Sequence, residues 1–250
     1  MNQHFRFRVA EHSHTGRVRT VNEDARLSQE AVGLWAVADG MGGHENGQWA
    51  SQTVIAALEA TDTEGEIETG ADAICASLRH ANAAIHDAAE KAGKTMGSTA
   101  VVLLVREGRF ACFWVGDSRA YLLRGGQLVQ LTEDHTQVQD LVSRGLLSAE
   151  EAVGHPLSNV ISRAVGVMPT IEIDAISDEV RPRDVFLLCS DGLTGLVEAR
   201  EIEAKLRELQ PTHASQELLD LALERGGPDN ITLVLVACEE RTAILSGAGS

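Results

Sequence analysis

Residues 98–131 read STAVVLLVREGRFACFWVGDSRAYLLRGGQLVQL, and this stretch decides the class of fold. It contains the apolar runs TAVVLLV, RFACFWV and AYLLR, followed by GQLVQL. The pairs Glu107-Gly108, Asp117-Ser118 and Gly125-Gly126 separate these runs, and such pairs are typical of turns between strands. The stretch therefore predicts an antiparallel meander in the middle of the chain.

Strand and helix patterns extend from the meander in both directions. Strands are predicted at 32–38, 171–180, 184–189 and 231–238, helices at 44–60, 72–92, 198–209 and 214–225, and short helical pieces within 136–166. Consecutive hairpins and paired helices favour an α+β fold over a parallel one. Two sheets packed face to face, with helices outside, would bury both faces of runs such as VVLLV. Without a repeat or linker, we expect one domain over 1–250, with a frayed tail at 241–250.

Charge and cysteine usage restrict the class of protein. The formal net charge is -16, so the long-range field would repel nucleic acid and anionic membranes. The cysteines are far apart and mostly in apolar runs, which is typical of buried reduced thiols rather than of a zinc site. The first residues, MNQHFRFRVAEH, lack a signal-peptide pattern, and no apolar run approaches the roughly 20 residues that span a bilayer. We expect a cytoplasmic protein.

Four aspartates flank apolar strands at corresponding places. They are Asp39 in VADGMGG, Asp117 in WVGDSRAY, Asp191 in LLCSDGL and Asp229 in GGPDNITL. A single Asp-Gly pair is common in turns, but four such carboxylates at one sheet edge would repel one another unless cations neutralised them. Hard divalent cations prefer oxygen ligands, so the pattern predicts a magnesium or manganese cluster. The glycine after Asp39 would let the Gly40 carbonyl approach a cation as well.

The segment GRVRTVNED places Arg19, Glu23 and Asp24 close behind the predicted first strand. An arginine fork suits bidentate phosphate binding, and the two acids could hold the waters of a metal site. A solvated charge cluster is the alternative if the segment is considered alone.

These segments resemble the metal-dependent protein phosphatase family, called PPM or type 2C, in its compact bacterial form. The resemblance covers nearly the whole chain. It rests on GRVRTVNED, VADGMGGHENGQWAS, MGSTAVVLL, VGDSRAYLLRGGQL, LTEDHT, NVISRAVG, LLCSDGLTGL and GGPDNITLVLV, in that order. It implies an αββα sandwich of two antiparallel sheets with a metal pair at one end, and a variable flap from about residue 136 to 166.

The resemblance also implies roles for individual residues. Asp39 would be the ligand that bridges two Mn²⁺ or Mg²⁺ ions, Gly40 a carbonyl ligand, and Asp191 and Asp229 the other protein ligands. Asp117 together with Asp191 would hold a weaker third ion. Glu23 and Asp24 match positions that bind the waters of the metals, and Arg19 matches the phosphate-binding arginine.

Two positions depart from the family pattern. His14 stands where the opening motif usually has an acid, and Met41 stands where animal members have a histidine after Asp-Gly. His44 is a candidate proton donor close by. His135 in LTEDHT is interpreted as structural, capping or bracing the following helix.

The predicted activity is hydrolysis of phosphoserine and phosphothreonine by a hydroxide that bridges the two metals, which reverses a bacterial serine/threonine kinase. The CxxxxxR, GxxxxGKS/T and GxSxG motifs are absent, which disfavours tyrosine phosphatase, nucleotide hydrolase and acyl-transfer chemistry. A non-catalytic scaffold and a hydrolase of small phosphoesters or diesters remain as alternatives. The expected partners are phosphorylated proteins and a cognate kinase, and we expect a monomer.

Overall fold

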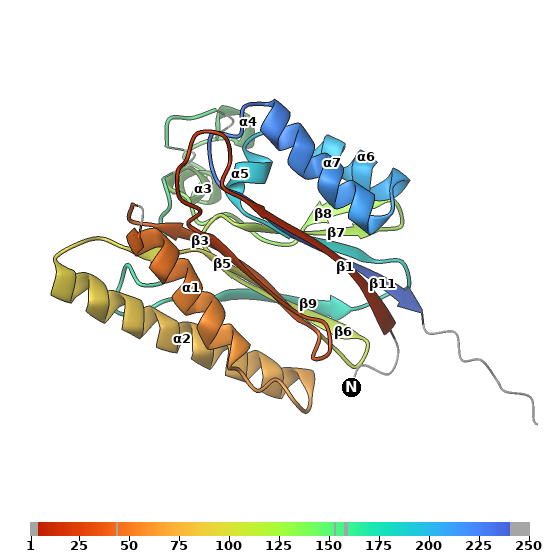
Figure 1. Ribbon diagram of the computed structural model, residues 1–250, viewed down its shortest axis with the longest axis horizontal. Helices are drawn as coiled ribbons and strands as arrows, with labels where there is room; N and C mark the ends of the chain where they lie inside the picture. The colour runs from red at the N-terminus through yellow and green to blue at the C-terminus, as the bar shows by residue number, and fades with distance from the viewer. Residues whose placement is uncertain (1–4, 44, 153, 158–159, 241–250) are drawn as a thin grey trace, which may run out of the picture.

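The computed structural model describes residues 5–43, 45–152, 154–157 and 160–240, and these form two antiparallel sheets packed face to face (Figure 1). The first sheet has the order β1 (Phe5–His14), β11 (Ile231–Glu240), β10 (Val185–Cys189), β7 (Arg119–Arg124), β8 (Gln127–Gln130). The second has the order β2 (Asp24–Gln29), β3 (Leu34–Met41), β5 (Ala100–Arg106), β6 (Arg109–Val115), β9 (Asp174–Glu179), and β4 (Gly97–Ser98) pairs with β3.

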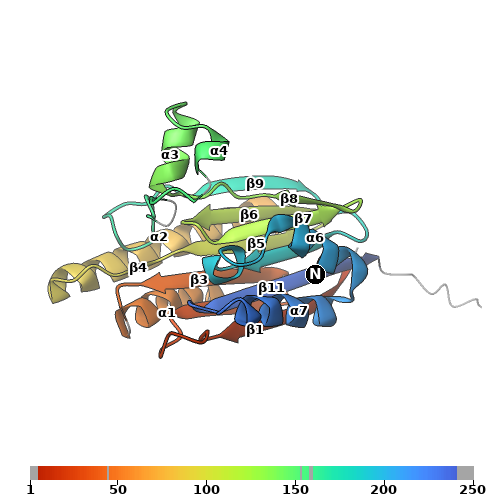
Figure 2. The ribbon, with the colours of Figure 1, turned by 90° about the horizontal axis from the view of Figure 1, so that it is seen from above.

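Helices cover the outer face of each sheet. In Figure 1, α1 (Glu45–Glu59) and α2 (Ile67–Ala92) lie below the second sheet, while α6 (Ala199–Glu208) and α7 (Pro211–Glu224) lie above the first. The short helix α5 (Asp191–Thr194) follows β10. Two further short helices, α3 (Gln137–Ser143) and α4 (Ala149–Ala152), project from the sandwich in Figure 2. The predicted α+β sandwich is therefore confirmed.

Strand β5 shows how the apolar runs build the layers. Val101 and Leu103 face the core between the two sheets, while Val102 and Leu104 face the core beneath α1 and α2. Alternate side chains of a strand point to opposite faces, so a strand in the middle of four layers must be apolar at every position. A third core joins α6 and α7 to the outer face of the first sheet.

The meander and its turns lie where the sequence places them, with β5 to β8 joined by the predicted pairs. Several predicted boundaries are wrong, and the strand β2 was not predicted. Strand β3 continues through Asp39 and Gly40 to Met41, because Gly40 and Met41 pair with β4. Helix α2 begins at Ile67, five residues earlier than predicted.

All four cysteines are free. Cys112, Cys189 and Cys238 are buried in β6, β10 and β11, as the apolar runs predicted. Cys75, in α2, is half-buried. Burial raises the pKa of Cys112 to about 12. Within the described ranges, no helix is both long and apolar enough to cross a membrane. The predicted frayed tail at 241–250 lies outside the described residues.

Candidate active site

One end of the sandwich gathers most of the predicted site residues. A hollow of about 230 Å³ there is lined by Arg19, Glu23, Asp39, Gly40, Asp117, Asp191 and Asp229, together with Met41, Gly42, Gly43, Ile161 and Asn230. Asp24 lies just behind it, because Asp24 and Asp39 are paired across β2 and β3. His44 lies outside the described residues. A larger hollow of about 550 Å³ between α6, α7 and the far ends of β10 and β11 contains none of these residues.

The two sheets contribute the aspartates from strands and adjoining turns. Asp39 is in β3, where its amide donates to the Thr99 hydroxyl at 2.9 Å. Asp117 lies in the turn between β6 and β7, Asp191 begins α5 directly after β10, and Asp229 precedes β11. Because the sheets stack face to face, strand ends from both meet at this edge, which brings the carboxylates together.

The carboxylates are buried and raise one another's pKa. Burial and the charges of Asp24 and Asp191 raise the pKa of Asp39 well above its usual range. Burial and the charge of Asp229 raise the pKa of Asp191, although its hydrogen bond to Asp39 acts in the opposite direction. Burial and the charges of Asp191 and Asp134 raise the pKa of Asp117 to about 7. Without positive charge nearby, these groups cannot all ionise at neutral pH.

Asp24 is buried behind the hollow and incompletely bonded. Its Oδ2 accepts a hydrogen bond from the Ser190 hydroxyl at 2.8 Å, whereas its Oδ1 is buried with no hydrogen-bond partner among the described residues. Burial is the main reason that the pKa of Asp24 rises to about 7. An unsatisfied buried carboxylate oxygen is costly, so this atom is a candidate acceptor for a water of the site.

Arg19 and Asp229, predicted to bind phosphate and metal respectively, are bound to each other. The Arg19 guanidinium donates to Asp229 Oδ2 at 2.9 Å, and this bond raises the pKa of Arg19. Both side chains are about half exposed, at 56% and 40% of their surface. Arg19 is thus in the site, but its charge is already paired.

Close backbone contacts fix the floor of the hollow. A Cβ atom on Gly40 would lie 2.0 Å from the Gly47 carbonyl oxygen and 2.6 Å from that of Glu23. A Cβ atom on Gly192 would lie 1.9 Å from the carbonyl oxygen of Asn230. Only glycine fits at these two positions, so the residues after Asp39 and Asp191 let α1 and β11 approach them.

Asn230 is a functional residue that the sequence reasoning missed. Its Oδ1 accepts from the Glu23 amide at 2.7 Å, and its Nδ2 donates to the carbonyls of Thr15 at 2.8 Å and Val21 at 3.0 Å. These bonds span the loop that carries Arg19. The only signal in the sequence is its position next to Asp229.

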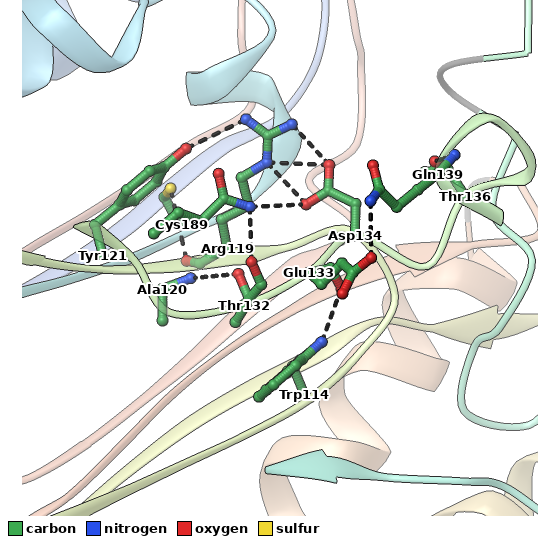
Figure 3. Close-up of polar contacts among 11 residues, drawn as sticks. Trp114, Arg119, Ala120, Tyr121, Thr132, Glu133, Asp134, Thr136, Gln139 and Cys189 are labelled. Atoms are coloured by element: carbon green, nitrogen blue, oxygen red, sulfur yellow. Dashed lines mark hydrogen bonds and ion pairs between the residues drawn. The ribbon is translucent and has the colours of Figure 1, made fainter. Parts of the chain in front are cut away.

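A second missed feature adjoins Asp117. Arg119 binds Asp134 through its Nε and Nη2, with Nη2 at 2.7 Å, and its Nη1 donates to the Tyr121 hydroxyl (Figure 3). Although burial disfavours the charged form, the hydrogen bonds that Arg119 donates to Asp134 raise the pKa of Arg119 above its ordinary value. With Asp117 and Asp191, this pair lines a hollow of about 480 Å³ next to the first, facing α3.

His135 is structural, as predicted, but it does not cap the helix. Thr136 caps α3, because its side chain accepts from the Gln139 amide. The His135 ring is buried; its Nδ1 accepts from the Gly116 amide at 3.1 Å, and its Nε2 lies 3.1 Å from Asp174 Oδ2. His135 therefore holds the turn that presents Asp117.

The donor set fits a hard divalent cation, since buried carboxylate and carbonyl oxygens gather at one hollow and repel one another without positive charge. Among the described residues, no three histidine, cysteine or acidic side chains are grouped closely enough to hold a metal ion as they stand. Asp229, one of the proposed ligands, lines the hollow and is paired with Arg19. The chemistry of the oxygens therefore fits hard divalent cations.

Fold and site together define the class: an α+β sandwich with an oxygen-donor site at the edge where its two sheets meet. The family model described as Protein phosphatase 2C matches residues 6–141. The chain is 41% identical over 236 residues to the serine/threonine protein phosphatase PstP of Mycobacterium tuberculosis, covering 91% of this chain but 44% of PstP. It is 36% identical over 234 residues to the serine/threonine phosphatase stp of Listeria monocytogenes, covering 88% of this chain and 92% of that protein.

A solved structure of one of these relatives is also similar to this chain in fold. The catalytic domain of PstP, in complex with 2 manganese ions, superposes with a TM-score of 0.82 at 37% identity, covering 95% of this chain and all of that one. The chain belongs to the protein phosphatase 2C family, as the sequence motifs predicted.

Proposed function

We propose that this protein is a serine/threonine phosphoprotein phosphatase that uses Mn²⁺ or Mg²⁺ to hydrolyse phosphoserine and phosphothreonine. The observation that carries the proposal is the gathering of Asp39, Asp191 and Asp229 beside Arg19 in one hollow. Carboxylates for cations and a guanidinium for phosphate oxygens are the two requirements of phosphomonoester hydrolysis by a metal site. The names of the relatives and the manganese ions of PstP support the same assignment.

The residues divide into those that hold cations and those that bind phosphate. Asp39, the Gly40 carbonyl, Asp191 and Asp229 would hold two cations, and Asp117 with Asp191 would hold a third. When bound, the cations would supply positive charge and lower the pKa of a water beside the phosphate. Glu23 and Asp24 would accept hydrogen bonds from waters at this end of the sandwich.

Arg19 would bind the non-bridging phosphate oxygens, whose charge must be stabilised as the ester bond breaks. Its guanidinium is half exposed at the mouth of the hollow, so it can reach a phosphate presented from solvent. Asn230 would position Arg19, because it bonds the loop on both sides of that residue.

The proposal extends to the substrates, the cellular location and the domain organisation of the protein. The substrates would be phosphorylated proteins and the opposing enzyme a serine/threonine kinase, because the relatives carry these phosphatase names. Four free thiols support a cytoplasmic location, and we propose a monomer. Residues 1–250 would form one domain in which 136–166 is a flap, and the projection of α3 and α4 from the sandwich supports this division (Figure 2).

The test is hydrolysis by the purified protein of a phosphothreonine peptide, with a bis-aryl phosphodiester for comparison, with and without Mn²⁺. We expect Mn²⁺-dependent release of phosphate from the peptide in preference to the diester. A preference for the diester would instead indicate a hydrolase of small phosphodiesters.

Replacement of Asp39 tests the residue assignment. Asp39→Asn removes the negative charge of a carboxylate that is proposed to hold both cations. The variant should lower kcat by about a thousandfold or more, because hydrolysis of the phosphate ester depends on the bound cations. Isothermal titration with Mn²⁺ should show weaker binding by the variant. Hydrolysis at the wild-type rate by Asp39→Asn would refute the assignment.

A further inference from the structure

An apolar surface leads away from the candidate active site on the side of α2. Met41 lines the site hollow together with Asp39. The Met41 Cε and the Val167 Cγ2 each lie 2.9 Å from the position that a Cβ atom on Gly97 would take. Met41 and Val167 therefore both lie next to Gly97, and Met41 also lines the site hollow.

The segment that carries Val167 is held in place by one buried side chain. Asn82 of α2 is 2% exposed; its Oδ1 accepts from the Gly166 amide at 2.7 Å, and its Nδ2 donates to the Met168 carbonyl at 2.9 Å. Val167 and Met168 are nevertheless 37% and 61% exposed. Neighbouring large apolar side chains that a fixed backbone holds toward solvent are typical of a binding surface.

Val167 also lines a hollow of about 280 Å³ between this segment and the end of α2, which we call the Val167 hollow. Three apolar side chains line it, those of Ala89, Met96 and Val167. The other lining residues are Gly93, Thr95, Gly166, His86, Glu90 and Lys94. It adjoins the site hollow, because a Cβ atom on Gly42 would lie 2.8 Å from the Thr95 carbonyl oxygen and 2.9 Å from the Met96 Cα. Gly42 lines the site hollow, so the two hollows are separated by little more than its backbone.

The size and charge of the Val167 hollow indicate its occupant. Its volume of about 280 Å³ is at the lower end of the roughly 300–1,000 Å³ of small-molecule sites and is large enough for one apolar side chain. Glu90 and Lys94 carry opposite charges and offset each other, so neither a cationic nor an anionic side chain is favoured. The apolar walls remain as the main source of binding free energy.

We propose that the Val167 hollow binds an apolar side chain of the phosphoprotein substrate, close in sequence to the phosphorylated residue. The inference rests on the proposed phosphatase function and adds a substrate preference to it. A peptide with its phosphate at Arg19 would cross Gly42 to reach the hollow.

Phosphothreonine peptides test the preference. In an otherwise polar peptide, leucine is placed at each position in turn on either side of the phosphothreonine, and each peptide is compared with its asparagine counterpart. We expect leucine at one position to raise kcat/KM by about tenfold, mainly through KM, which is typical of one apolar contact.

A matched pair of variants tests the location. Val167→Ser should lower the leucine-to-asparagine ratio to about a third of its wild-type value or less, because it removes an apolar wall of the hollow. Val129→Ser is the control, since Val129 is 53% exposed in β8 of the other sheet and should keep the wild-type ratio. Both changes are at exposed positions, so folding should survive them.

The outcomes separate the two proposals. Hydrolysis of all the peptides with equal kcat/KM, or an unchanged ratio in Val167→Ser, would overturn the inference and leave the phosphatase function standing. Failure to hydrolyse any phosphopeptide in the presence of Mn²⁺ would overturn both.

Discussion

The ion pair between Arg19 and Asp229 joins a proposed phosphate ligand to a proposed metal ligand. Neither side chain is fully buried, so the pair is easily broken and its stabilising contribution is small. A cation that attracts Asp229 would release the guanidinium toward phosphate. Metal binding and phosphate binding would then support each other at this position.

Arg19→Ala tests this coupling. We expect kcat/KM for a phosphopeptide to fall by about a hundredfold, because a charge-assisted contact to the reacting phosphate is lost. Mn²⁺ affinity, measured by isothermal titration, should be maintained or increased, since Asp229 no longer has an arginine partner. Arg17→Ala, at an exposed position in the same loop, should retain wild-type values. Weaker Mn²⁺ binding by Arg19→Ala would contradict the interpretation.

At the element scale, the turn between β6 and β7 shows how neighbouring segments hold one carboxylate. His135 accepts from the Gly116 amide on one side of Asp117, and Arg119 binds Asp134 on the other (Figure 3). Both contacts come from the LTEDHT segment that follows β8. The position of Asp117 therefore depends on this segment as well as on its own turn.

Asp134→Ala should destabilise the protein by about 3 kcal/mol, because it leaves the largely buried Arg119 guanidinium without its carboxylate partner. Urea denaturation measures the free energy of unfolding. Glu198→Ala is the matched control: it removes an exposed partner of Arg200 as well as one half of a capping box, and should cost only about 1 kcal/mol. If both variants lost the same free energy of unfolding, the ion pair of Arg119 with Asp134 would stabilise the protein no more than an exposed ion pair does.

At the scale of the whole molecule, the clustered carboxylates make stability depend on pH and metal. Burial raises the pKa of Asp24 and of Asp117 to about 7, above the unfolded value of 3.8. Between these values the folded state binds more protons than the unfolded state, so stability falls as pH rises. The loss should accumulate as pH rises toward about 7 and level off above that value.

The metal-free protein should therefore be less stable at pH 8 than at pH 5, by on the order of 3 kcal/mol. Thermal unfolding in EDTA at the two pH values measures this difference. Excess Mn²⁺ should restore most of the stability at pH 8, because cations offset the repulsion between carboxylates and bind only the folded state. A metal-free protein whose stability rises from pH 5 to pH 8 would contradict the raised pKa values.

Much of the fold can be predicted from local patterns. The run VVLLV is apolar at successive positions because β5 lies between two cores, and Gly125-Gly126 closes the hairpin of β7 and β8. The aspartates after or within the strands were also predicted to meet, and they line one hollow. The strand run and the hairpin depend on residues near one another in the chain, which is where periodicity and turn preferences carry information. The aspartates are far apart in the chain, and their meeting was inferred from their shared position at strand ends.

Local sequence patterns thus predicted most of the strands, the layers and the candidate ligands Asp39, Asp191 and Asp229, but not the strand β2. The three-dimensional packing was needed to show that Arg19 pairs with Asp229 and that Asn230 holds the Arg19 loop. It was also needed to show that Asn82 holds the segment of Val167, which lies next to Gly97. Each of these contacts joins residues far apart in the chain. Their geometry depends on how the two sheets and α2 pack, and no local pattern encodes that packing.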